Sequence, residues 1–498
     1  MEVFKKIDNL LPKIAPVAFI LLTFLFSILF RIPFYDEAHA YLISQLNLVE
    51  IFDLTRYEGH TFLWYFLLKI SAIKESFYPY NMLILNWIIA SILIIFFWIK
   101  APFNNLIKFL ITFSVPFFQY FGVVSRPYTL SVLVLFLLTY LYIKKINIKK
   151  PILFLFLIIL CANTSTIAIF GAFGFFILFL IDTYKYRKKI KKKTIIIAIL
   201  TIFFGLITYL AQFLNLNFEE LHFEIENKFW DNIYLKFTLF PFFIAKGENV
   251  FEVIYRHICF VLFYFILFLL FKKDKKILIF LMSILLPFTY FLTFIHIGAF
   301  WHRYFYFIYL IVVLWLCYEK VIQNKVFKII FYAFLIFSLT SYSFFDNGKY
   351  ERMQTKYYKN MFFEVNKYKN AKLYSFDWLG GMSGVLPYLK NNGIKVYDLD
   401  NYDRTSYEGL KAHQKYRYIY ADMDKFFDSL DIKKENYVVS NKKLFMIRFL
   451  NPEFKYYLNK SNNCLDVLYN TEKRKAKFEA VFCNREKEFS IYKINLIK

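Results

Sequence analysis

Two adjacent carboxylic acids, Asp36 and Glu37, follow directly after the first long apolar segment of the chain. A carboxylate near a membrane surface can accept a proton from a hydroxyl group that acts as a nucleophile. Because charged groups are costly close to hydrocarbon, an acidic pair at the end of a membrane span is a candidate functional site. The alternative is a solvated loop with two ordinary surface acids, and the surrounding sequence has to decide between these interpretations.

Basic and aromatic side chains in the same loop and in later loops could bind an anion. Between residues 31 and 80 the further polar candidates are His39, Tyr41, Arg56, Glu58 and His60. Later candidates are Arg126, between two apolar segments, and the pair His302 and Arg303 at the start of another. Arginine suits a phosphate best because its guanidinium can donate two parallel hydrogen bonds. Each residue also has a structural interpretation, since an arginine can snorkel to the membrane surface and a histidine can cap a helix or face solvent.

The composition indicates an integral membrane protein. Of the 498 residues, 59% are hydrophobic and 23% are aromatic, and the mean hydropathy is +0.43. The apolar residues form long runs, which is typical of membrane spans. The first run, at about 14–30, has no small-residue cleavage pattern. We therefore expect it to remain as a span, with the N-terminus in the cytoplasm.

Segments of about 20 residues, long enough to cross a bilayer as helices, occur at 14–31, 81–99, 106–122, 127–143, 194–213, 249–271, 277–296, 302–319 and 326–345. The apolar stretch 152–181 is too long for one span, and lysine clusters flank both of its ends. Because positive charge marks the cytoplasmic side, this stretch should cross twice and turn at about residues 163–166. The sequence therefore predicts an α-helical polytopic membrane protein with about 11 transmembrane helices.

The charge distribution agrees with this topology. The predicted cytoplasmic segments contain 23 basic and five acidic residues, whereas the predicted external loops before residue 346 contain 10 basic and 13 acidic residues. This is the bias expected for a multi-pass protein of the bacterial inner membrane. Much of the net charge of +25 then reflects membrane orientation, so the basic composition gives no support for nucleic-acid binding.

Residues 346–498 contain no apolar run long enough to span. They carry 29 basic and 19 acidic residues, and an odd number of spans places them outside, as a periplasmic domain. Strands are predicted at 371–376, 394–397, 416–420 and 437–440, with a helix before Asn392-Gly393 and a closing hairpin over 475–494. This pattern predicts a small α/β domain. The glycines at 380–384 match no nucleotide-binding spacing and indicate a structural turn.

The cysteines fit the same placement. Cys161, Cys259 and Cys317 lie in apolar spans, where cysteine usually behaves as a small buried hydrophobe. Cys464 and Cys483 are the two cysteines of the C-terminal domain. An oxidising periplasm would allow them to form a disulfide.

The first external loop, residues 32–80, contains two apolar stretches that are too short to cross a bilayer, at about 38–48 and 60–73. Aromatic residues and Lys69 in the second stretch suit a helix that lies along the membrane interface. The sequence therefore predicts two juxtamembrane helices that hold the carboxylates at the membrane surface. Together with the spans they would form a transmembrane domain of residues 1–345.

Three short motifs resemble one family of membrane enzymes. They are Asp36-Glu37 followed by Tyr41, the segment from Glu58 to Tyr65, and His302-Arg303-Tyr304 at the start of a late span. With the layout of residues 1–345, they look like the polytopic glycosyltransferases with the C-type fold, closest to the protein O-mannosyltransferase and lipid A aminoarabinose transferase group. The resemblance implies transfer of a sugar from a polyprenyl-phosphate carrier to an acceptor outside the cytoplasmic membrane, with an external C-terminal domain.

The resemblance also implies roles for single residues. Asp36 would be the general base of an inverting hexosyl or pentosyl transfer, with Glu37 as second choice or as the group that orients it. The leaving lipid phosphate would be bound by residues among Arg303, His302, Arg126, His60 and Arg56. Glu58, Tyr41 and His39 are further candidates for contacts with the acceptor. The acceptor would be an envelope glycan, lipid or protein, and membrane lipids would be further partners.

One departure from the family lies in the second external loop, where its members commonly have an acid and this chain has Ser125-Arg126-Pro127-Tyr128. A metal or acceptor contact from that loop therefore lacks its usual ligand. A divalent metal could use the acids and His222 at 219–226, but their alternation also suits a polar face lying on the membrane. We assign no metal ligand and no cofactor.

Three other functions would also fit a multi-pass membrane protein with an external domain. A lipid-linked glycan flippase or transporter would line a cavity near the bilayer midplane, often between repeated halves, whereas the notable acids here cluster in one loop. An envelope glycan polymerase or ligase would depend on large external loops between later spans. The C-terminal domain could also be a binding module on a passive anchor, although the predicted number of spans exceeds what anchoring requires.

Overall fold

The computed structural model of the protein describes most of residues 2–186 and shorter parts of the remainder. The described ranges are 2–29, 31–33, 35–55, 60–72, 77–186, 271–272, 274–292, 300–321, 359–375, 385–398, 403–408, 410–411, 435–441, 454–459, 464–470, 475–483 and 489–497, with the single residues 196, 200, 203, 205, 207, 210, 268 and 430. The chain forms two compact units. The first contains Met1–Leu29, Gly59–Trp64 and Leu83–Asn347, and the second contains Phe30–Glu58, Tyr65–Met82 and Gly348–Lys498. Most of the first loop thus groups with the C-terminal part of the chain.

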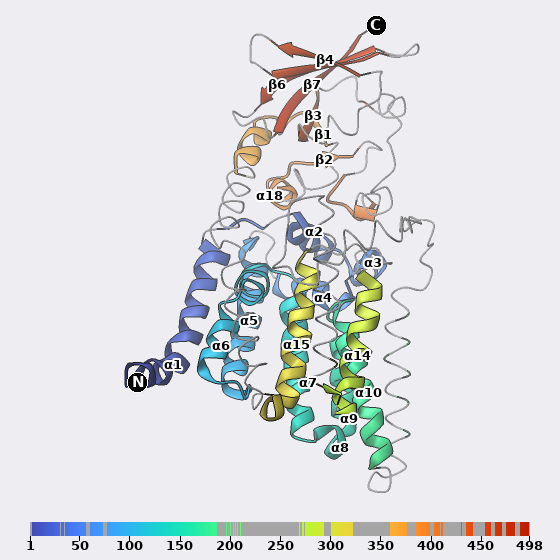
Figure 1. Ribbon diagram of the computed structural model, residues 1–498. Coiled ribbons are helices and arrows are strands. Elements are labelled where there is room, and N and C mark those ends of the chain that lie inside the picture. The colour runs from blue at the N-terminus through green and yellow to red at the C-terminus, as the bar shows by residue number, and fades with distance from the viewer. Residues whose placement is uncertain are drawn as a thin grey trace, which may run out of the picture. The chain divides into compact units, whose positions relative to one another are not determined.

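The first unit is built from helices (Figure 1). Their bounds are α1 (Glu2–Phe24) with the π-helical turn η1 (Leu25–Leu29), α5 (Tyr80–Lys100), α6 (Asn105–Thr112), the π-helix η3 (Pro116–Val123), α7 (Tyr128–Ile143), α8 (Ile146–Lys149), α9 (Pro151–Ala162), α10 (Ala168–Lys185), α14 (Lys275–Tyr290) and α15 (Phe300–Val321). Among the described residues, three helices are long and apolar enough to cross a membrane, at Asn9–Leu29, Tyr80–Lys100 and Ala168–Lys185. Shorter apolar helices include most of α7, α9 and α15. The described residues therefore have the mainly helical, apolar character of a membrane protein.

One predicted span is bent. The segment predicted as a single helix at 106–122 consists of α6 and η3, which meet at 54°. Pro116 begins η3, and a proline breaks the hydrogen-bond ladder because it has no N–H and its ring blocks the preceding turn. If this pair is counted as one span, the described part of the chain has up to four. The predicted span at 326–345, and all but single residues of the predicted spans at 194–213 and 249–271, lie outside the described residues.

The stretch predicted to cross twice is divided as expected, because α9 ends at Ala162 and α10 begins at Ala168. α10 packs against α7, α9 and α14. A methyl group at Gly171 would lie 2.5 Å from Leu135 Cδ2 of α7, and one at Gly174 would overlap Ile284 of α14. Small residues at such contacts are typical of helices that pack closely in membranes.

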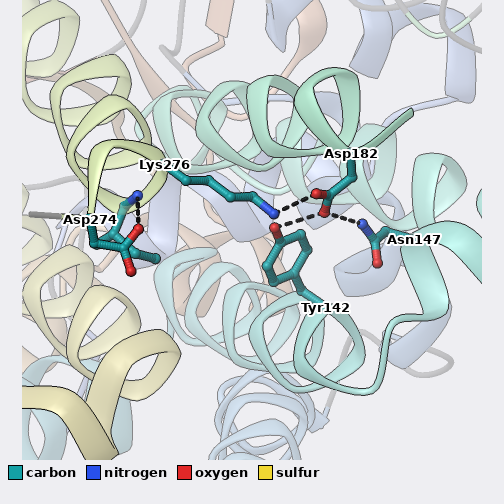
Figure 2. A network of polar contacts seen from close by, with 6 residues as sticks. Tyr142, Asn147, Asp182, Asp274 and Lys276 are labelled. Atoms are coloured by element: carbon teal, nitrogen blue, oxygen red, sulfur yellow. Dashed lines mark hydrogen bonds and ion pairs between the residues drawn. The ribbon is translucent and has the colours of Figure 1, made fainter. Parts of the chain in front are cut away.

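A buried carboxylate on α10 joins this helix to three others. The contact lies near the end of α7 that the sequence predicts to be cytoplasmic. Figure 2 shows Asp182 of α10 facing side chains from α7, α8 and α14. Its Oδ2 accepts hydrogen bonds from Tyr142 Oη and Asn147 Nδ2, both at 2.8 Å, and its Oδ1 forms an ion pair with Lys276 Nζ. The Lys276 ammonium also lies 5.0 Å from the centre of the Tyr142 ring. A carboxylate that satisfies three donors at once should stabilise this end of the bundle.

Replacing Asp182 by alanine is therefore expected to lower the free energy of unfolding by about 2–3 kcal/mol, because it leaves the buried Asn147 amide and the half-buried Tyr142 hydroxyl without their acceptor. The exposed part of Lys276 limits the additional loss from the ion pair. The measurement is the stability of the purified protein in detergent. Asp274→Ala is the matched control, because Asp274 caps α14 by accepting a hydrogen bond from Ile277 N, and the loss of such a cap should cost about 1 kcal/mol. Equal losses in the two variants would contradict the interpretation of the network.

The described parts of the first loop contain three short helices where the sequence predicts two. They are α2 (Tyr35–Ser44), α3 (Leu48–Thr55) and α4 (Phe62–Ser71). The prediction of one helix at 38–48 is wrong because Asn47 starts a new helix. Its Oδ1 accepts from Val49 N and Glu50 N at 3.0 Å, and Glu50 Oε2 accepts from Asn47 N at 3.1 Å. This reciprocal capping is readable in the sequence as Asn-x-x-Glu.

The C-terminal part of the second unit contains a mixed sheet and a short helix. The described strands are β1 (Lys372–Ser375), β2 (Val396–Tyr397), β3 (Asn436–Asn441), β4 (Phe454–Asn459), β5 (Cys464–Asn470), β6 (Lys475–Cys483) and β7 (Phe489–Ile497), with α18 (Leu386–Asn391) between β1 and β2. They form one seven-stranded sheet in the order β2-β1-β3-β7-β6-β5-β4. β2, β1 and β3 are parallel, and the remaining pairs are antiparallel. Leu373 and Tyr374 are both fully buried, so β1 is covered on both faces, as is usual in a parallel sheet.

Most strands lie where the sequence predicts them, including the closing hairpin as β6 and β7. β4 and β5 are additional strands, and the predicted strand at 416–420 and the glycine-rich turn at 380–384 lie outside the described residues. Cys464 begins β5 and Cys483 ends the neighbouring strand β6. Their side chains lie outside the described part of the structure, so the predicted disulfide stays a prediction.

Candidate functional site

Four polar side chains from three separate segments meet in the helical unit. His60 precedes α4, Arg126 and Tyr128 lie where η3 gives way to α7, and His302 is in the first turn of α15. All four are buried, and Arg126 is only 7% exposed. The sequence predicts three of them as ligands of a phosphate, and the structure brings these three together around Tyr128.

The contacts within this cluster are short. Arg126 Nη2 lies 2.8 Å from His60 Nε2. Tyr128 Oη lies 2.7 Å from His302 Nε2 and 3.4 Å from His60 Nε2. The Arg126 guanidinium also lies 5.8 Å from the centre of the Tyr128 ring, within the range of a cation–π contact. Tyr128 therefore links the two histidines and supports the arginine.

The hydrogen-bond pattern fixes the protonation of one histidine. A guanidinium only donates, so His60 Nε2 must accept from Arg126. The His60 ring is then neutral, with its proton on Nδ1. Protonation of Nε2 would remove this acceptor and place two positive groups in contact. With a neutral His60, the Arg126 guanidinium keeps its positive charge without a carboxylate in this contact, so the cluster is suited to a group that carries negative charge.

The backbone around the cluster also favours an anion. His60 lies two residues before α4, Tyr128 is the first residue of α7, and His302 is in the first turn of α15. Three helix N-termini therefore meet here, and each carries a partial positive charge of roughly half an elementary charge. The peptide dipoles and the positive charge of Arg126 would both attract an anion to the cluster.

Hydroxyl groups anchor the cluster to the turn between α9 and α10. Thr61 Oγ1 donates to Asn163 O, next to His60. Ser131 Oγ of α7 lies 2.9 Å from the hydroxyls of Thr164 and Ser165. Tyr309 Oη of α15 donates to the carbonyl of residue 167 at 2.6 Å. Because these bonds join the segments that carry the cluster, they hold its members at fixed separations.

The two acids singled out in the sequence lie in the second unit, in the first turn of α2. Glu37 is fully buried and forms an ion pair with Arg31, which is also buried. Asp36 is partly exposed. Tyr41 on the same helix is buried, and its Oη accepts a hydrogen bond from Asn81 Nδ2 at 3.3 Å. The pair is therefore divided into a buried structural acid and a more accessible one.

Replacing Glu37 by glutamine is expected to lower the free energy of unfolding by about 3–5 kcal/mol, because it leaves the Arg31 guanidinium buried without its carboxylate. The measurement is the unfolding midpoint of the purified protein. The double variant Arg31→Met/Glu37→Leu should recover much of the loss, since apolar residues of similar volume often replace a buried ion pair without cost. A Glu37→Gln variant as stable as the wild type would contradict the structural role.

The remaining predicted residues are less informative. Arg303 follows His302 on α15 and is partly exposed, and successive helical residues point about 100° apart. His39 is buried in α2. Arg56 and Glu58 lie outside the described residues. The sequence analysis did not identify Tyr128 as a member of the site. The available signal was a tyrosine at the start of a span, two residues after Arg126.

No group of three or more metal-binding side chains occurs among the described residues, and the acids at 219–226 lie outside them. No known protein family, characterised protein or solved structure matches this chain.

Proposed function

We propose that this protein is a membrane glycosyltransferase that moves a sugar from a polyprenyl-phosphate carrier to an acceptor outside the cytoplasmic membrane. The observation that carries the proposal is the buried cluster of Arg126, His60, Tyr128 and His302 at the meeting of three helix N-termini. A buried arginine surrounded by hydrogen-bonding side chains and helix dipoles is suited to a phosphate. The C-type glycosyltransferases that the sequence resembles use such a donor.

The proposed leaving group explains why the cluster combines these residue types. When the bond between the anomeric carbon and the phosphate oxygen breaks, negative charge develops on the phosphate. Arg126 can donate two hydrogen bonds to it, and Tyr128 and the imidazoles can donate further ones. Donors that are already fixed by packing stabilise such charge most effectively, because they need not reorganise during the reaction.

A lipid carrier fits the surface of the helices. Large apolar side chains are exposed on several helices, including Leu21 of α1, Ile92 and Ile99 of α5, and Phe173 of α10. In a bilayer such surfaces contact hydrocarbon. A phosphate on a polyprenyl chain could reach a cluster at helix ends while its chain stays in the membrane.

The proposed base is Asp36. It would take the proton of an acceptor hydroxyl as the hydroxyl oxygen attacks the anomeric carbon, and the electron pair of the broken bond would leave with the lipid phosphate. Glu37 is a poorer choice because its carboxylate is buried against Arg31. We assign Glu37 the role of holding the first turn of α2 in place.

The proposed topology has 11 spans, a cytoplasmic N-terminus and a periplasmic C-terminal domain in a bacterial inner membrane. The distribution of side chains supports this orientation. Lys100 and Lys144 both lie over the Tyr140 ring, and Lys276 pairs with Asp182, near the end of α7 opposite to Tyr128. The lysines thus lie at one end of α7 and the cluster of Arg126, His60, Tyr128 and His302 at the other. A donor site on the external side of the membrane requires this arrangement. The excess of basic residues at 346–498 could attract an acidic acceptor.

The test is incubation of the purified protein with a panel of radiolabelled polyprenyl-phosphate sugars and a crude envelope fraction as acceptor. The proposal predicts that the label leaves one carrier and appears in acceptor material. In parallel, the same labelled lipids are placed in one leaflet of vesicles that contain the protein. Movement of intact labelled lipid between leaflets without release of sugar would overturn the proposal in favour of a flippase.

A further inference from the structure

Within the second unit, the helix that carries Asp36 lies against the C-terminal part of the chain. α18 packs on α2, although the two helices are more than 340 residues apart in the sequence. Leu386 and Leu389 of α18 are buried, as are Ala38 and Leu42 of α2. Apolar burial of this kind is the main source of stability in a helix contact.

Three tyrosines continue this contact. The Tyr41 ring of α2 lies 4.5 Å from the Tyr78 ring, and Tyr78 lies 4.9 Å from Tyr388 of α18 in an edge-on arrangement. Tyr41 and Tyr78 are buried. Phe362 also contacts Tyr388, with ring centres 6.1 Å apart. Aromatic pairs in this geometry are favourable beyond the area they bury.

A second, polar contact joins α3 to the same part of the chain. Tyr407 Oη donates to Asp53 Oδ2 at 2.6 Å, and Lys411 Nζ lies 3.1 Å from the same oxygen. Burial and the hydrogen bond to Asp53 raise the pKa of Tyr407, so the phenol remains a donor at neutral pH. Lys411 is 39% exposed, so this contact is weaker than the aromatic one.

α18 is joined to the sheet by the chain. It connects the neighbouring parallel strands β1 and β2. Gly393 ends the helix in the left-handed region, at φ +71°, and Ile394 N donates to Leu389 O at 2.9 Å. α18, Tyr388, Tyr78 and α2 thus form a packed series, and the chain connects α18 to β1 and β2.

From these contacts we infer that the C-terminal domain is a brace that positions the Asp36-bearing helix, with Tyr388 and Tyr78 as the positioning residues. The inference rests on the proposed function only in taking Asp36 as the base. It assigns the domain a mechanical role in the transfer step, in addition to any attraction of an acceptor by its charge. Loosening the brace should lower kcat and leave the KM for the lipid donor within about twofold, because the donor cluster is formed by other residues.

The test compares amide hydrogen exchange of the full-length protein in lipid nanodiscs for Tyr388→Ala, Tyr388→Phe and Lys390→Ala. Tyr388→Ala is expected to raise exchange in residues 35–44 at least about tenfold, because local opening becomes easier when packing contacts are lost. Tyr388→Phe keeps the ring, and Lys390→Ala changes a partly exposed neighbour on α18, so both should exchange like the wild type. Unchanged exchange of α2 in Tyr388→Ala would overturn the inference.

If Tyr388→Ala also loosens β1 and β3, Tyr78→Leu serves as the second variant. It removes the aromatic contact with Tyr388 from the side of the first loop and leaves the residues of the sheet unchanged. We expect faster exchange in residues 35–44 with unchanged exchange in β1, and protection equal to the wild type would overturn the inference. Exchange needs no substrate, so a wild-type protein that transfers no sugar would refute the proposed function and leave the brace intact. With transfer established, a Tyr388→Ala variant with normal kcat would refute the brace alone.

Discussion

Replacing Asp36 by asparagine is expected to lower the turnover number for sugar transfer about 10²- to 10⁴-fold, the usual contribution of a general base. Asparagine has nearly the same shape as aspartate but cannot take the proton of the attacking hydroxyl. Asp36 is partly exposed at the start of α2, so the change should leave the unfolding midpoint close to that of the wild type. The measurement is the initial rate of release of labelled sugar at saturating donor.

Glu50→Gln provides the matched control, because it removes another carboxylate of the same loop that caps α3 through Asn47 N. Its turnover should stay within about twofold of the wild type, since it changes only a helix cap. An Asp36→Asn variant that keeps more than about one tenth of the turnover would move the base elsewhere, since that loss is smaller than a general base contributes.

Replacing Arg126 by alanine should lower kcat/KM for the lipid donor about 10²- to 10³-fold, because it removes a fixed donor to the leaving phosphate. Arg126→Lys should fall between alanine and the wild type. Lysine keeps the charge but cannot reproduce the paired hydrogen bonds or the planar contact with Tyr128. Steady-state rates over a range of donor concentrations give both constants.

Lys144→Ala is the control for a general loss of positive charge. Lys144 is exposed at the opposite end of α7 and should affect kcat/KM less than about twofold, since it lies well beyond the reach of a direct contact with the cluster. Equal effects of Arg126→Ala and Lys144→Ala would mean that net charge, and not the cluster, attracts the donor.

The helices with the clearest apolar patterns are the ones that the sequence predicts well. The predicted span at 81–99 is one residue shorter than α5 at each end. The predicted span at 127–143 begins one residue before α7 and ends at the same residue. The turn at 163–166 also follows from sequence, because lysines on both sides force an even number of crossings. The bend between α6 and η3 is visible only as Pro116 inside an apolar run, and hydropathy averages over it.

The chemistry of the cluster can be predicted from sequence, but its assembly cannot. Arg126, His60 and His302 are costly in apolar surroundings, which marks them as candidates. Their convergence on Tyr128 depends on how α7 and α15 pack, and no local pattern encodes that contact. The different environments of Asp36 and Glu37 also cannot be predicted from sequence, where the two acids look equivalent. In the structure Glu37 is buried against Arg31, six residues earlier in the chain, whereas Asp36 is partly exposed.

The C-terminal strands show a similar limit. β1, β2 and β3 are short and apolar, and their burial makes the pattern clear. β4 and β5 carry mixed polar and apolar residues, and they pair with each other and with β6. Cross-strand pairing is non-local, so a sequence pattern alone gives a weak signal for such strands.

The most direct test of the central claim is the binding of a short-chain polyprenyl phosphate to the purified wild-type protein, compared with the same polyprenol without phosphate. If the cluster of Arg126, His60, Tyr128 and His302 holds the phosphate, the phosphorylated lipid should bind about 100-fold more tightly, equivalent to about 2.7 kcal/mol. Most of that difference should disappear in Arg126→Ala. Equal affinity of the wild-type protein for the two lipids would show that the cluster does not hold the phosphate.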